Sequence, residues 1–308
     1  MASQPTMERP SVMTTIDIML PYYGDVALMQ DAVRSVLAQE DPGWRLTVVD
    51  DTEEPSVPGW FESLADDRVR YYRNERNLGV TGNFTRCLEL AEHELMSMLG
   101  ADDLLLPNYV GTVLAAYRDH PGSGMIQPGV EVIDEHGKLV KGLADEVKRR
   151  LYRPKVDGKR LMGGEELATS LLRGNWLYFP AMTWRTEAIK SIGFRPELRT
   201  TQDLALELEL IERGEQMVLD STVCFQYRRH LESVSSKMAL DGDRFTEERA
   251  LFLSMAERMR AKGWRRAERA ARGHSASRLH ALTLLPTAMR GGQRDIARAL
   301  AKHAFGNS

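Results

Sequence analysis

The sequence predicts an α/β fold in which helices flank a sheet, followed by an all-helical C-terminal extension. Short apolar runs alternate with segments of helical spacing over the first 130 residues, which is the pattern of strands separated by helices. The runs are continuously apolar, as expected of parallel strands that are buried on both faces. From Asp243 onward the apolar residues recur at helical spacing, so we expect only helices there.

The first half contains strands and helices in alternation. The expected strands are 16–20, which stops at Pro21, followed by 46–49, 69–72 and 94–99. Helices are predicted over Val26–Leu37 and 83–91 from their apolar periodicity. Pro107 begins a third helix, since proline fits the first turn.

The second half has a mixed pattern. A strand is expected at 131–134, and the polar, basic, weakly periodic stretch 139–162 predicts a mobile loop or lid. The elements expected after it are a helix over 163–174, a strand at 181–184, a short helix ending at 192–193, a helix over 203–213 that Thr201 caps and Gly214 closes, and one or two strands within 218–227. Three helices follow, the first broken at Gly263, the second over 264–285 and stopped by Pro286, and the third over 294–304.

Composition excludes several classes of protein. The 308 residues are 43% hydrophobic and 28% charged, the balance of an ordinary soluble globular protein with one large domain or two modest ones. The two cysteines, Cys87 and Cys224, exclude a disulfide framework or a zinc site of paired cysteines, and they suit a reducing cytoplasm. No apolar run reaches the roughly 18 residues of a transmembrane helix. Residues 1–14 are polar and lack the apolar core of a signal peptide.

Charge is distributed unevenly along the chain. Residues 244–308 contain 14 Lys and Arg against 5 Asp and Glu, whereas residues 1–243 contain 27 against 39. The asymmetry predicts a basic module attached to an acidic body. We therefore expect a flexible tail over 1–14, a main domain over 15–240 with halves 15–130 and 131–240, and a basic helical extension over 241–308.

Two pairs of carboxylates follow strands of the predicted sheet. Asp50 and Asp51 come after the second strand, and Asp102 and Asp103 after the fourth. Ligands of such sheets bind beyond the carboxyl ends of the strands, so the pairs predict a site for a cation, a sugar or a nucleotide. Mg²⁺ or Mn²⁺ at the second pair would bridge to a diphosphate. The alternative is that both pairs only cap turns and helices.

Three further clusters carry polar chemistry. Gly79 lies in a loop over 74–80 that precedes a helix, where backbone N–H groups can face an anion. Asp203 begins a helix and can act as a general base for an acceptor hydroxyl, or merely complement the helix dipole. Residues 227–230 and 233–236 supply Arg, His and Ser side chains that suit a diphosphate, or form a solvated basic loop.

Taken in this order, the motifs resemble those of the family 2 inverting glycosyltransferases, and the likeness spans residues 15–236. The matching stretches are 18–23 (IMLPYY), 48–52 (VVDDT), 77–80 (NLGV) with Asn83, 99–107 (LGADDLLLP), Gln202 with Asp203, and Tyr227 with Arg228, His230 and Ser235. The resemblance implies the GT-A fold, a Rossmann-like nucleotide-diphospho-sugar transferase architecture with a mixed sheet.

The resemblance also implies a role for each matching residue. The nucleotide would be bound by Pro21, Tyr22, Asp51, Asn77, Gly79, Asn83 and Asp102, with Asp51 on the base. Asp102, Asp103 and His230 would hold Mn²⁺ or Mg²⁺, and Arg228 and Ser235 would lie near the diphosphate. Asp203 matches the catalytic base. It would deprotonate an acceptor hydroxyl that displaces the nucleotide, inverting the anomeric carbon in a single displacement.

Two positions depart from the family pattern. Gly100 stands where an Asp-x-Asp motif has its first carboxylate, and Gln202 stands where many relatives have Glu. Both departures motivate an alternative, a nucleotide-sugar-binding scaffold without turnover. A sugar nucleotidyltransferase would carry a Gly-rich basic loop after the first strand, and residues 21–25 (PYYGD) do not form one.

The resemblance implies a UDP-sugar donor and a saccharide, lipid-linked or small-molecule acceptor. A basic run of Arg258, Arg260, Lys262, Arg265, Arg266, Arg269 and Arg272 lies in the extension. It can be a solvated face packed on the body or on a second copy of the chain, or it can contact anionic lipids at the inner face of the membrane. Nucleic-acid binding is disfavoured because no aromatic interleaving accompanies the run.

Overall fold

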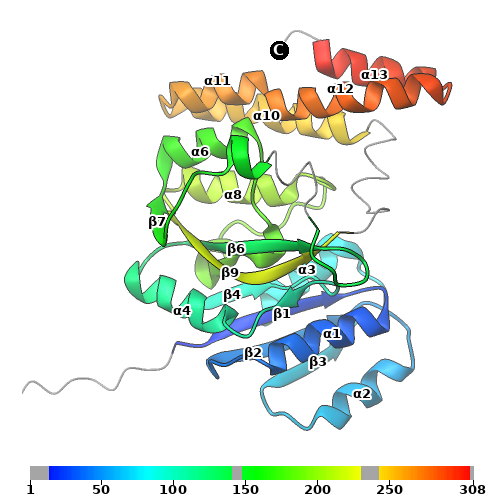
Figure 1. Cartoon of the computed structure of the whole chain (residues 1–308), viewed down its shortest axis with the longest axis vertical. Coiled ribbons are helices and arrows are strands. Elements are labelled where there is room, and N and C mark those ends of the chain that lie inside the picture. Colours follow the sequence, from blue (N-terminus) through cyan, green and yellow to red (C-terminus); the bar gives the residue numbers. More distant parts are fainter. Residues whose placement is uncertain (1–13, 141–147, 230–242, 306–308) are drawn as a thin grey trace, which may run out of the picture.

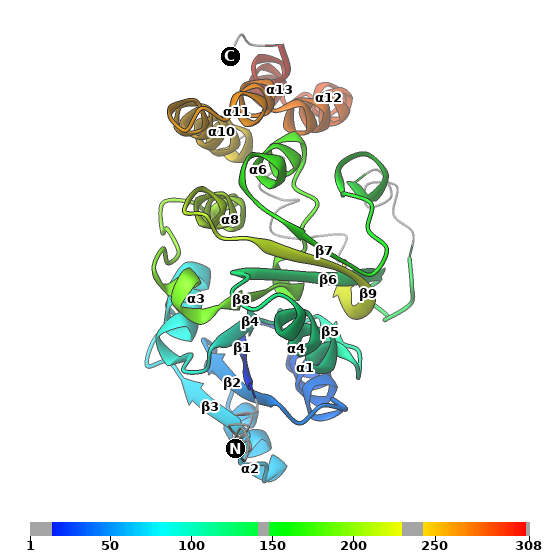
Figure 2. The same cartoon turned by 90° about the vertical axis from the view of Figure 1, so that its left-hand side faces the viewer.

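The computed structural model describes residues 14–140, 148–229 and 243–305. Figures 1 and 2 show a twisted sheet in the middle of the molecule, helices on both of its faces, and a layer of helices at one end. The predicted tail over 1–14 lies almost entirely outside the described residues.

The first half forms the parallel part of the sheet. Strands β1 (Ile16–Tyr22), β2 (Trp44–Asp50), β3 (Val69–Arg73) and β4 (Leu95–Met98) alternate with helices α1 (Val26–Leu37), α2 (Ser56–Leu64) and α3 (Gly79–Leu90). They pair in parallel in the order β3-β2-β1-β4. The carboxyl ends of β2, β1 and β4 are therefore neighbours at one edge.

The second half makes the sheet mixed, as the resemblance implies. Its elements are β5 (Leu104–Leu105), α4 (Tyr109–Asp119), β6 (Met125–Ile133), the π-helix η1 (Lys148–Tyr152), β7 (Lys159–Met162), α6 (Gly164–Arg173), the 3-10 turn η2 (Phe179–Ala181), β8 (Thr183–Arg185), α7 (Thr186–Lys190), α8 (Gln202–Glu212) and β9 (Met217–Arg228). Strand β8 pairs antiparallel with β4 and β6, and β9 pairs parallel with β6 but antiparallel with β5 and β7. Part of the expected loop over 139–162 is thus the strand β7.

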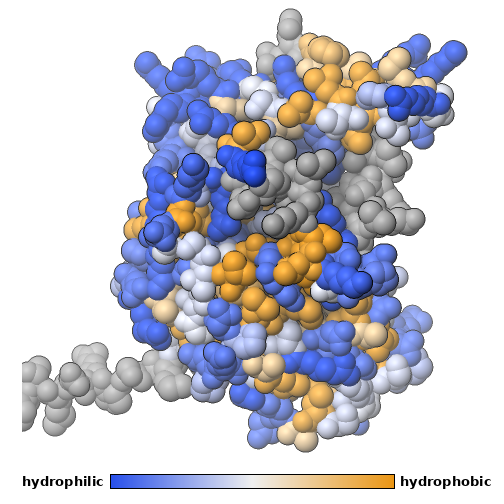
Figure 3. Space-filling view, in the orientation of Figure 1, coloured by the Kyte–Doolittle hydropathy of each residue, from blue (hydrophilic) through white to orange (hydrophobic). Residues whose placement is uncertain are grey.

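Four helices form the C-terminal extension: α10 (Asp243–Ala261), α11 (Arg265–Gly273), α12 (Ser275–Arg290) and α13 (Arg294–Phe305). They lie together at the end of the molecule remote from α2 (Figures 1 and 2). Apolar side chains gather over α12 and α13 on the surface (Figure 3). None of the helices in the described ranges is long and apolar enough to cross a bilayer.

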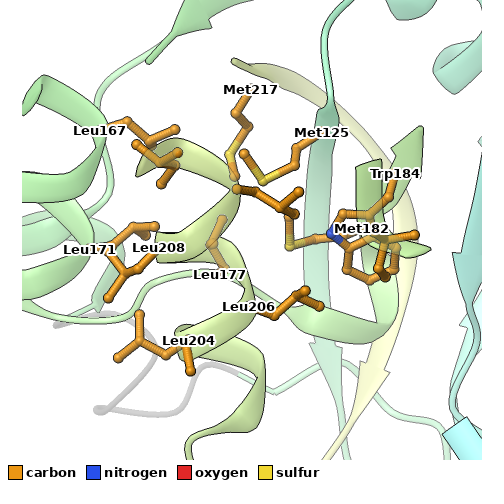
Figure 4. Packing of buried hydrophobic residues seen from close by; sticks show 14 of the residues in the cluster. Met125, Leu167, Leu171, Leu177, Met182, Trp184, Leu204, Leu206, Leu208 and Met217 are labelled. Carbon is orange, nitrogen blue, oxygen red and sulfur yellow. The ribbon is translucent and has the colours of Figure 1, made fainter. Parts of the chain in front are cut away.

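Two hydrophobic clusters sandwich the sheet. One joins the sheet to α1, α2 and α4, and the other joins it to α3, α6 and α8. Figure 4 shows the second cluster, where leucines of α6 and α8 meet Met125, Met182, Trp184 and Met217. The extension takes part in this cluster through Leu251, Phe252, Met255, Met259, Ala267 and Ala271. Helices α10 and α11 are thus packed on the main body, whereas α12 and α13 share a smaller cluster around Phe245.

Two expectations about proline were wrong, and a third proline lies in a helix that was not predicted. Strand β1 continues through Pro21, because β4 ends opposite Met19 and only β2 pairs with the end of β1, which leaves the missing N–H without consequence. Helix α2, which was not expected, holds Pro58 in its first turn, where N–H groups have no helical partner. Helix α12 passes through Pro286 and ends at Arg290, because Leu285 and Ala288 on either side pack into the cluster around Phe245.

The expected helix over 264–285 is two helices. The break lies at His274, whose backbone adopts a φ of 28° and separates α11 from α12. The imidazole of His274 is buried at this bend. Sequence periodicity could not reveal the break because Ala and Arg continue the helical pattern on both sides.

Candidate functional site

The end of β2 is held by the buried carboxylate of Asp50. It accepts hydrogen bonds from the Tyr71 hydroxyl at 2.5 Å and from Nε and Nη2 of Arg73 at 2.9 and 2.7 Å. It also accepts from the backbone N–H and the hydroxyl of Thr52 at 2.8 and 2.7 Å. Burial and the bond to Asp50 raise the pKa of the Tyr71 hydroxyl. Asp50 therefore ties β3 to β2 at the edge where ligands bind in such sheets.

The next residue, Asp51, binds the start of α3. Its carboxylate accepts from the backbone N–H groups of Leu78, at 2.8 Å, and Gly79, at 3.0 Å, and from Nδ2 of Asn74 at 2.8 Å. Gly79 has a φ of +70°, which glycine adopts without strain. The sequence suggested the N–H groups of 81–83 for an anion, and the N–H groups of Leu78 and Gly79 just before them face a carboxylate of the protein itself. Asp51 thereby fixes the loop between β3 and α3.

Asparagines complete this loop. Asn77 donates to the carbonyl of Asp51 at 3.2 Å and accepts from the N–H of Gly79 at 2.8 Å. Asn83 is buried and donates to the carbonyl of Val49 at 3.0 Å, while its Oδ1 accepts from Asn74 at 3.2 Å. Asn74, which sequence reasoning did not single out, therefore bridges Asp51 and Asn83.

Pro21 and Tyr22 form the end of β1 beside this loop. The carbonyl of Tyr22 accepts from the N–H of Asp51 at 2.9 Å, and its hydroxyl donates to the carbonyl of Gly24 at 3.0 Å. The ring of Tyr22 is wholly buried, and burial together with nearby carboxylates, Asp50 first, raises the pKa of its hydroxyl to about 12. Tyr22 therefore contributes its backbone and its bulk at this edge.

The turn after β4 brings two carboxylates together over a glycine. Asp103 is buried and accepts from the backbone N–H of Arg228 at 2.7 Å. Burial, and then the charge of Asp102, raise the pKa of the Asp103 carboxyl well above its ordinary value. A Cβ atom at Gly100 would lie 2.5 Å from Oδ2 of Asp103 and 3.1 Å from Oδ1 of Asp102. A side chain at position 100 would therefore require the carboxylate of Asp103 to move.

Arg228 is a scaffold for this turn. Its Nε donates to the carbonyl of Asp102 at 2.7 Å, and its Nη1 to the carbonyls of Asp134 and Glu135 at 3.1 and 3.2 Å. The side chain is buried, so the guanidinium ties the turn after β4 to the turn after β6. The other predicted residues of this segment, His230 and Ser235, lie outside the described residues.

A divalent cation fits the chemistry of the acidic turn. Asp102 and Asp103 are hard oxygen donors of the kind that Mg²⁺ and Mn²⁺ prefer. Within the described ranges, no group of three or more His, Cys, Asp or Glu side chains is arranged to hold a metal ion. Two carboxylates alone do not complete the coordination shell of such a cation, and the third predicted ligand, His230, lies outside the described residues.

Helix α8 carries Asp203 in its first turn, and its start is bonded to α3. Oε1 of Gln202 accepts a hydrogen bond from the Thr81 hydroxyl at 3.2 Å. Because Asp51 holds the beginning of α3, this bond brings Asp203 to the loop that follows β3. The neutral Gln202 thus has a local function as an acceptor.

The start of α8 is capped from the C-terminal extension. We expected Thr201 to cap α8, but it makes no side-chain cap bond, and its hydroxyl donates instead to Oε1 of Glu247 at 2.8 Å. Glu247 on α10 also accepts from the N–H groups of Arg199, Thr200 and Thr201. These bonds lower the pKa of the Glu247 carboxyl although burial opposes them. No local signal marks Glu247, because 46 residues separate it from Thr201.

One turn beyond Asp203, Glu207 is a fully buried carboxyl. Neither of its oxygens has a hydrogen-bond partner among the residues that the structure describes. Burial, and then the charge of Asp203, raise its pKa well above the ordinary value. The flanking leucines of α8 pack into the core (Figure 4), so the helix holds Glu207 in apolar surroundings.

The structure thus brings Asp51, Asn77, Gly79 and Asn83 into one loop cluster and bonds α8 to it. Asp102 and Asp103 lie at the same edge of the sheet, since β1 separates β2 from β4 by a single strand. A cavity of about 620 Å³ lies elsewhere, with Glu40, Asp41, Asn108, Lys159 and Asp220 among its lining residues, and contains none of the predicted site residues.

Comparisons with known proteins agree with this architecture. Residues 17–169 match the family model described as glycosyl transferase family 2. The chain is 28% identical over 223 residues to the uncharacterized protein MT1568 of Mycobacterium tuberculosis, a match covering 70% of this chain and 67% of that protein. It is 25% identical over 230 residues to the uncharacterized glycosyltransferase RC0461 of Rickettsia conorii, covering 73% of this chain and 36% of the relative. The chain thus spans about a third of the Rickettsia protein.

A solved structure shares the fold over nearly the whole chain. Residues 1–349 of TarS from S. aureus, in complex with UDP-GlcNAc, superpose with a TM-score of 0.63 at 15% identity, covering 96% of this chain and 93% of that one. At this identity the likeness is one of fold. It confirms the predicted mixed sheet flanked by helices with a helical C-terminal region.

Proposed function

Because the chain belongs to glycosyl transferase family 2 and has the GT-A fold, we propose that it transfers a sugar from UDP to an acceptor hydroxyl with inversion at the anomeric carbon. The observation that carries the proposal is the hydrogen bond between Thr81 and Gln202, which joins the start of α8 to the loop held by Asp51. UDP is favoured as the nucleotide because TarS was solved with UDP-GlcNAc.

Asp203 is the proposed general base. Its carboxylate takes the proton of the acceptor hydroxyl, whose oxygen attacks the anomeric carbon from the face opposite the diphosphate. The bond between that carbon and the diphosphate oxygen breaks, and the electron pair leaves with the UDP. Glu207 is buried one turn away, and burial, followed by the charge of Asp203, raises the pKa of its carboxyl well above the ordinary value, which favours its neutral form beside Asp203.

The donor is bound by the loop cluster around Asp51 and by the acidic turn. Asp102 and Asp103 would hold Mn²⁺ or Mg²⁺, which supplies positive charge to the leaving diphosphate when bound. Arg228 keeps this turn in place through its three carbonyl contacts. In this proposal Pro21 and Tyr22 border the nucleotide, and residues 15–240 form the catalytic domain.

The test is transfer and donor binding by Asp203→Asn compared with the wild type. We expect transfer to fall by at least about 1,000-fold while the affinity for UDP stays within a factor of about three, because the base acts only in the chemical step. NMR of the product would give its anomeric configuration. Unchanged turnover would remove Asp203 from the role. UDP-sugar binding by the wild type without transfer or hydrolysis would favour the scaffold alternative.

A further inference from the structure

Two residues of the basic run that the sequence points to, Arg258 and Arg266, pair with the body of the protein. Arg258 on α10 pairs with Glu209 and Glu212 of α8 at 2.9 and 2.5 Å. On α11, Arg266 pairs with Glu165 of α6 at 3.4 Å. These contacts favour, for α10 and α11, the interpretation of a charged face packed on the main domain.

The outward side of α12 exposes apolar side chains. Leu279 is 51% exposed and Met289 is 67% exposed, and Pro286 is exposed between them, whereas Leu282 packs against the cluster around Phe245. The three exposed residues follow one another at intervals of seven and three positions, which places them on one side of the helix. Phe305 at the end of α13 is 70% exposed. Figure 3 shows these helices as apolar surface bordered by hydrophilic side chains.

The hairpin of α12 and α13 is rich in cations. The described residues from 274 to 305 contain the basic side chains Arg278, Arg290, Arg294, Arg298 and Lys302. The same stretch contains one carboxylate, Asp295, which pairs with Arg298 at 3.6 Å. Helix α12 has no acidic residue. A partner of this surface must therefore accept both apolar contact and several positive charges.

We propose that the hairpin of α12 and α13 docks on the surface of an anionic lipid bilayer. Leucine, methionine and phenylalanine would enter the boundary between headgroups and acyl chains, while the cations contact the headgroups. A second copy of the chain fits less well, because a symmetric contact would bring two sets of these cations together. Nucleic acid fits less well because its bases stack on aromatic rings, and α12 has none apart from His280.

The position of the hairpin suits a membrane-bound acceptor. In Figure 1 the turn between α12 and α13 lies on the side toward which β1 runs. The edge that carries Asp51 and Asp102 lies on that same side, since it is at the carboxyl ends of the strands. Docking would thus hold the proposed site near the lipid surface, where a lipid-linked acceptor is found. This last step rests on the proposed function.

The test is flotation of the full chain with vesicles of phosphatidylcholine alone or with about one third phosphatidylglycerol, at low and high salt. We expect the wild type to float with the anionic vesicles and to be released from neutral ones. Arg290→Glu with Arg294→Glu should weaken binding at least about tenfold. Arg118→Glu with Arg173→Glu, the same charge change on exposed positions elsewhere, should leave binding unchanged.

A second variant tests the apolar contribution. Leu279→Gln with Met289→Gln should weaken the binding that persists at high salt, with an unchanged melting temperature because both side chains are exposed. Failure of the wild type to float, or equal losses in the two charge variants, would overturn the proposal. A dimer that these Gln substitutions convert to monomer, without vesicle binding, would assign the surface to a second copy. Asp203→Asn should float normally, which separates this result from failure of the proposed chemistry.

Discussion

The carboxylate of Glu247 accepts hydrogen bonds from both the N–H group and the hydroxyl of Thr201, at 2.9 and 2.8 Å. Glu247 belongs to the C-terminal extension, and Thr201 precedes the helix that carries Asp203. The extension therefore holds the start of the helix that carries the proposed base. Loss of this contact would displace Asp203.

The first prediction concerns this cap. Glu247→Ala should destabilise the protein by about 1–3 kcal/mol, because three backbone N–H groups and two hydroxyls lose a charged acceptor. It should also lower kcat more than it raises KM for the donor. Urea denaturation and steady-state kinetics measure the two effects. Glu257→Ala, an exposed position on the same helix, is the control and should change neither.

The loop held by Asp51 gives the second prediction. Asp51→Ala leaves the N–H groups of Leu78 and Gly79 without their acceptor, so we expect a loss of about 1–3 kcal/mol in stability and at least about tenfold weaker UDP binding. Calorimetric titration with UDP and thermal denaturation would measure both. Asp31→Ala, on the exposed face of α1, provides the comparison. Wild-type affinity in Asp51→Ala would exclude this loop from the nucleotide site.

Restoring the family motif should harm the protein. Gly100→Asp places a Cβ 2.5 Å from the carboxylate of Asp103, so we expect about 1–3 kcal/mol of destabilisation and no tighter Mn²⁺ binding. Gly59→Ala in α2, where a Cβ meets nothing within 4 Å, should be neutral or stabilising. Chemical denaturation with and without Mn²⁺ is the measurement. A Gly100→Asp variant as stable as the wild type would show that the turn relaxes freely.

Glu207 predicts a pH dependence of stability. Its pKa is raised in the folded state, so the folded protein retains a proton that the unfolded chain releases above about pH 4.3. The contribution of Glu207 to the free energy of unfolding is fully present below that pH, and it is lost as the pH rises through the folded-state pKa. Glu207→Gln removes the titration, so its stability relative to the wild type should increase between about pH 5 and pH 8. Melting temperatures of both proteins across this range are the measurement, with the exposed Glu62→Gln as control. A difference between Glu207→Gln and the wild type that does not change with pH would show that Glu207 is ionised throughout.

The C-terminal helices should loosen in acid. Burial, and then the charge of His274, lower the pKa of His303 to about 4, and burial lowers that of His274 as well. Glu248, Arg249 and Arg278 are the charged groups that act on them. The folded state favours neutral imidazoles. Their contribution to the stability of the protein is therefore fully present above about pH 6.5 and is lost as the pH falls toward 4. Hydrogen exchange of 294–305 should accelerate over that window, and His303→Gln should flatten the change.

Local patterns predicted the elements whose signals are local. Helix α1 has the predicted bounds, and β1, β2, β3 and β4 lie where apolar runs end in polar residues, because strand burial and turn chemistry are both written in adjacent positions. The predicted end of the helix at Pro286 was too early, because proline disfavours a helix interior but packing on either side of Pro286 offsets its cost in α12. Helix α2, with Pro58 in its first turn, was not predicted.

The sequence predicted only those site residues that have a local signal, namely a position at the end of a strand or at the start of a helix. Asp51, Gly79 and Asp103 follow strands or open a helix, and the fold brings them to one edge. Arg228 and Glu247 act on residues far from them in the chain, so no spacing rule could assign Arg228 to backbone carbonyls or Glu247 to the start of α8. The burial of Glu207 could not be predicted because Glu207 alternates with leucines in the sequence, as Glu209 does, and nothing there distinguishes it from an exposed residue.

The shared packing of α10 and α11 with α6 and α8 has a practical consequence for dissecting the molecule. The change from an acidic to a basic composition near residue 241 suggests a truncation at this point. Such a truncation would expose the leucines of α6 and α8 to water. The shortened product would tend to aggregate, and its inactivity would say nothing about catalysis. A deletion that begins at α12 would leave α10 and α11 in place and would uncover only the smaller cluster around Phe245.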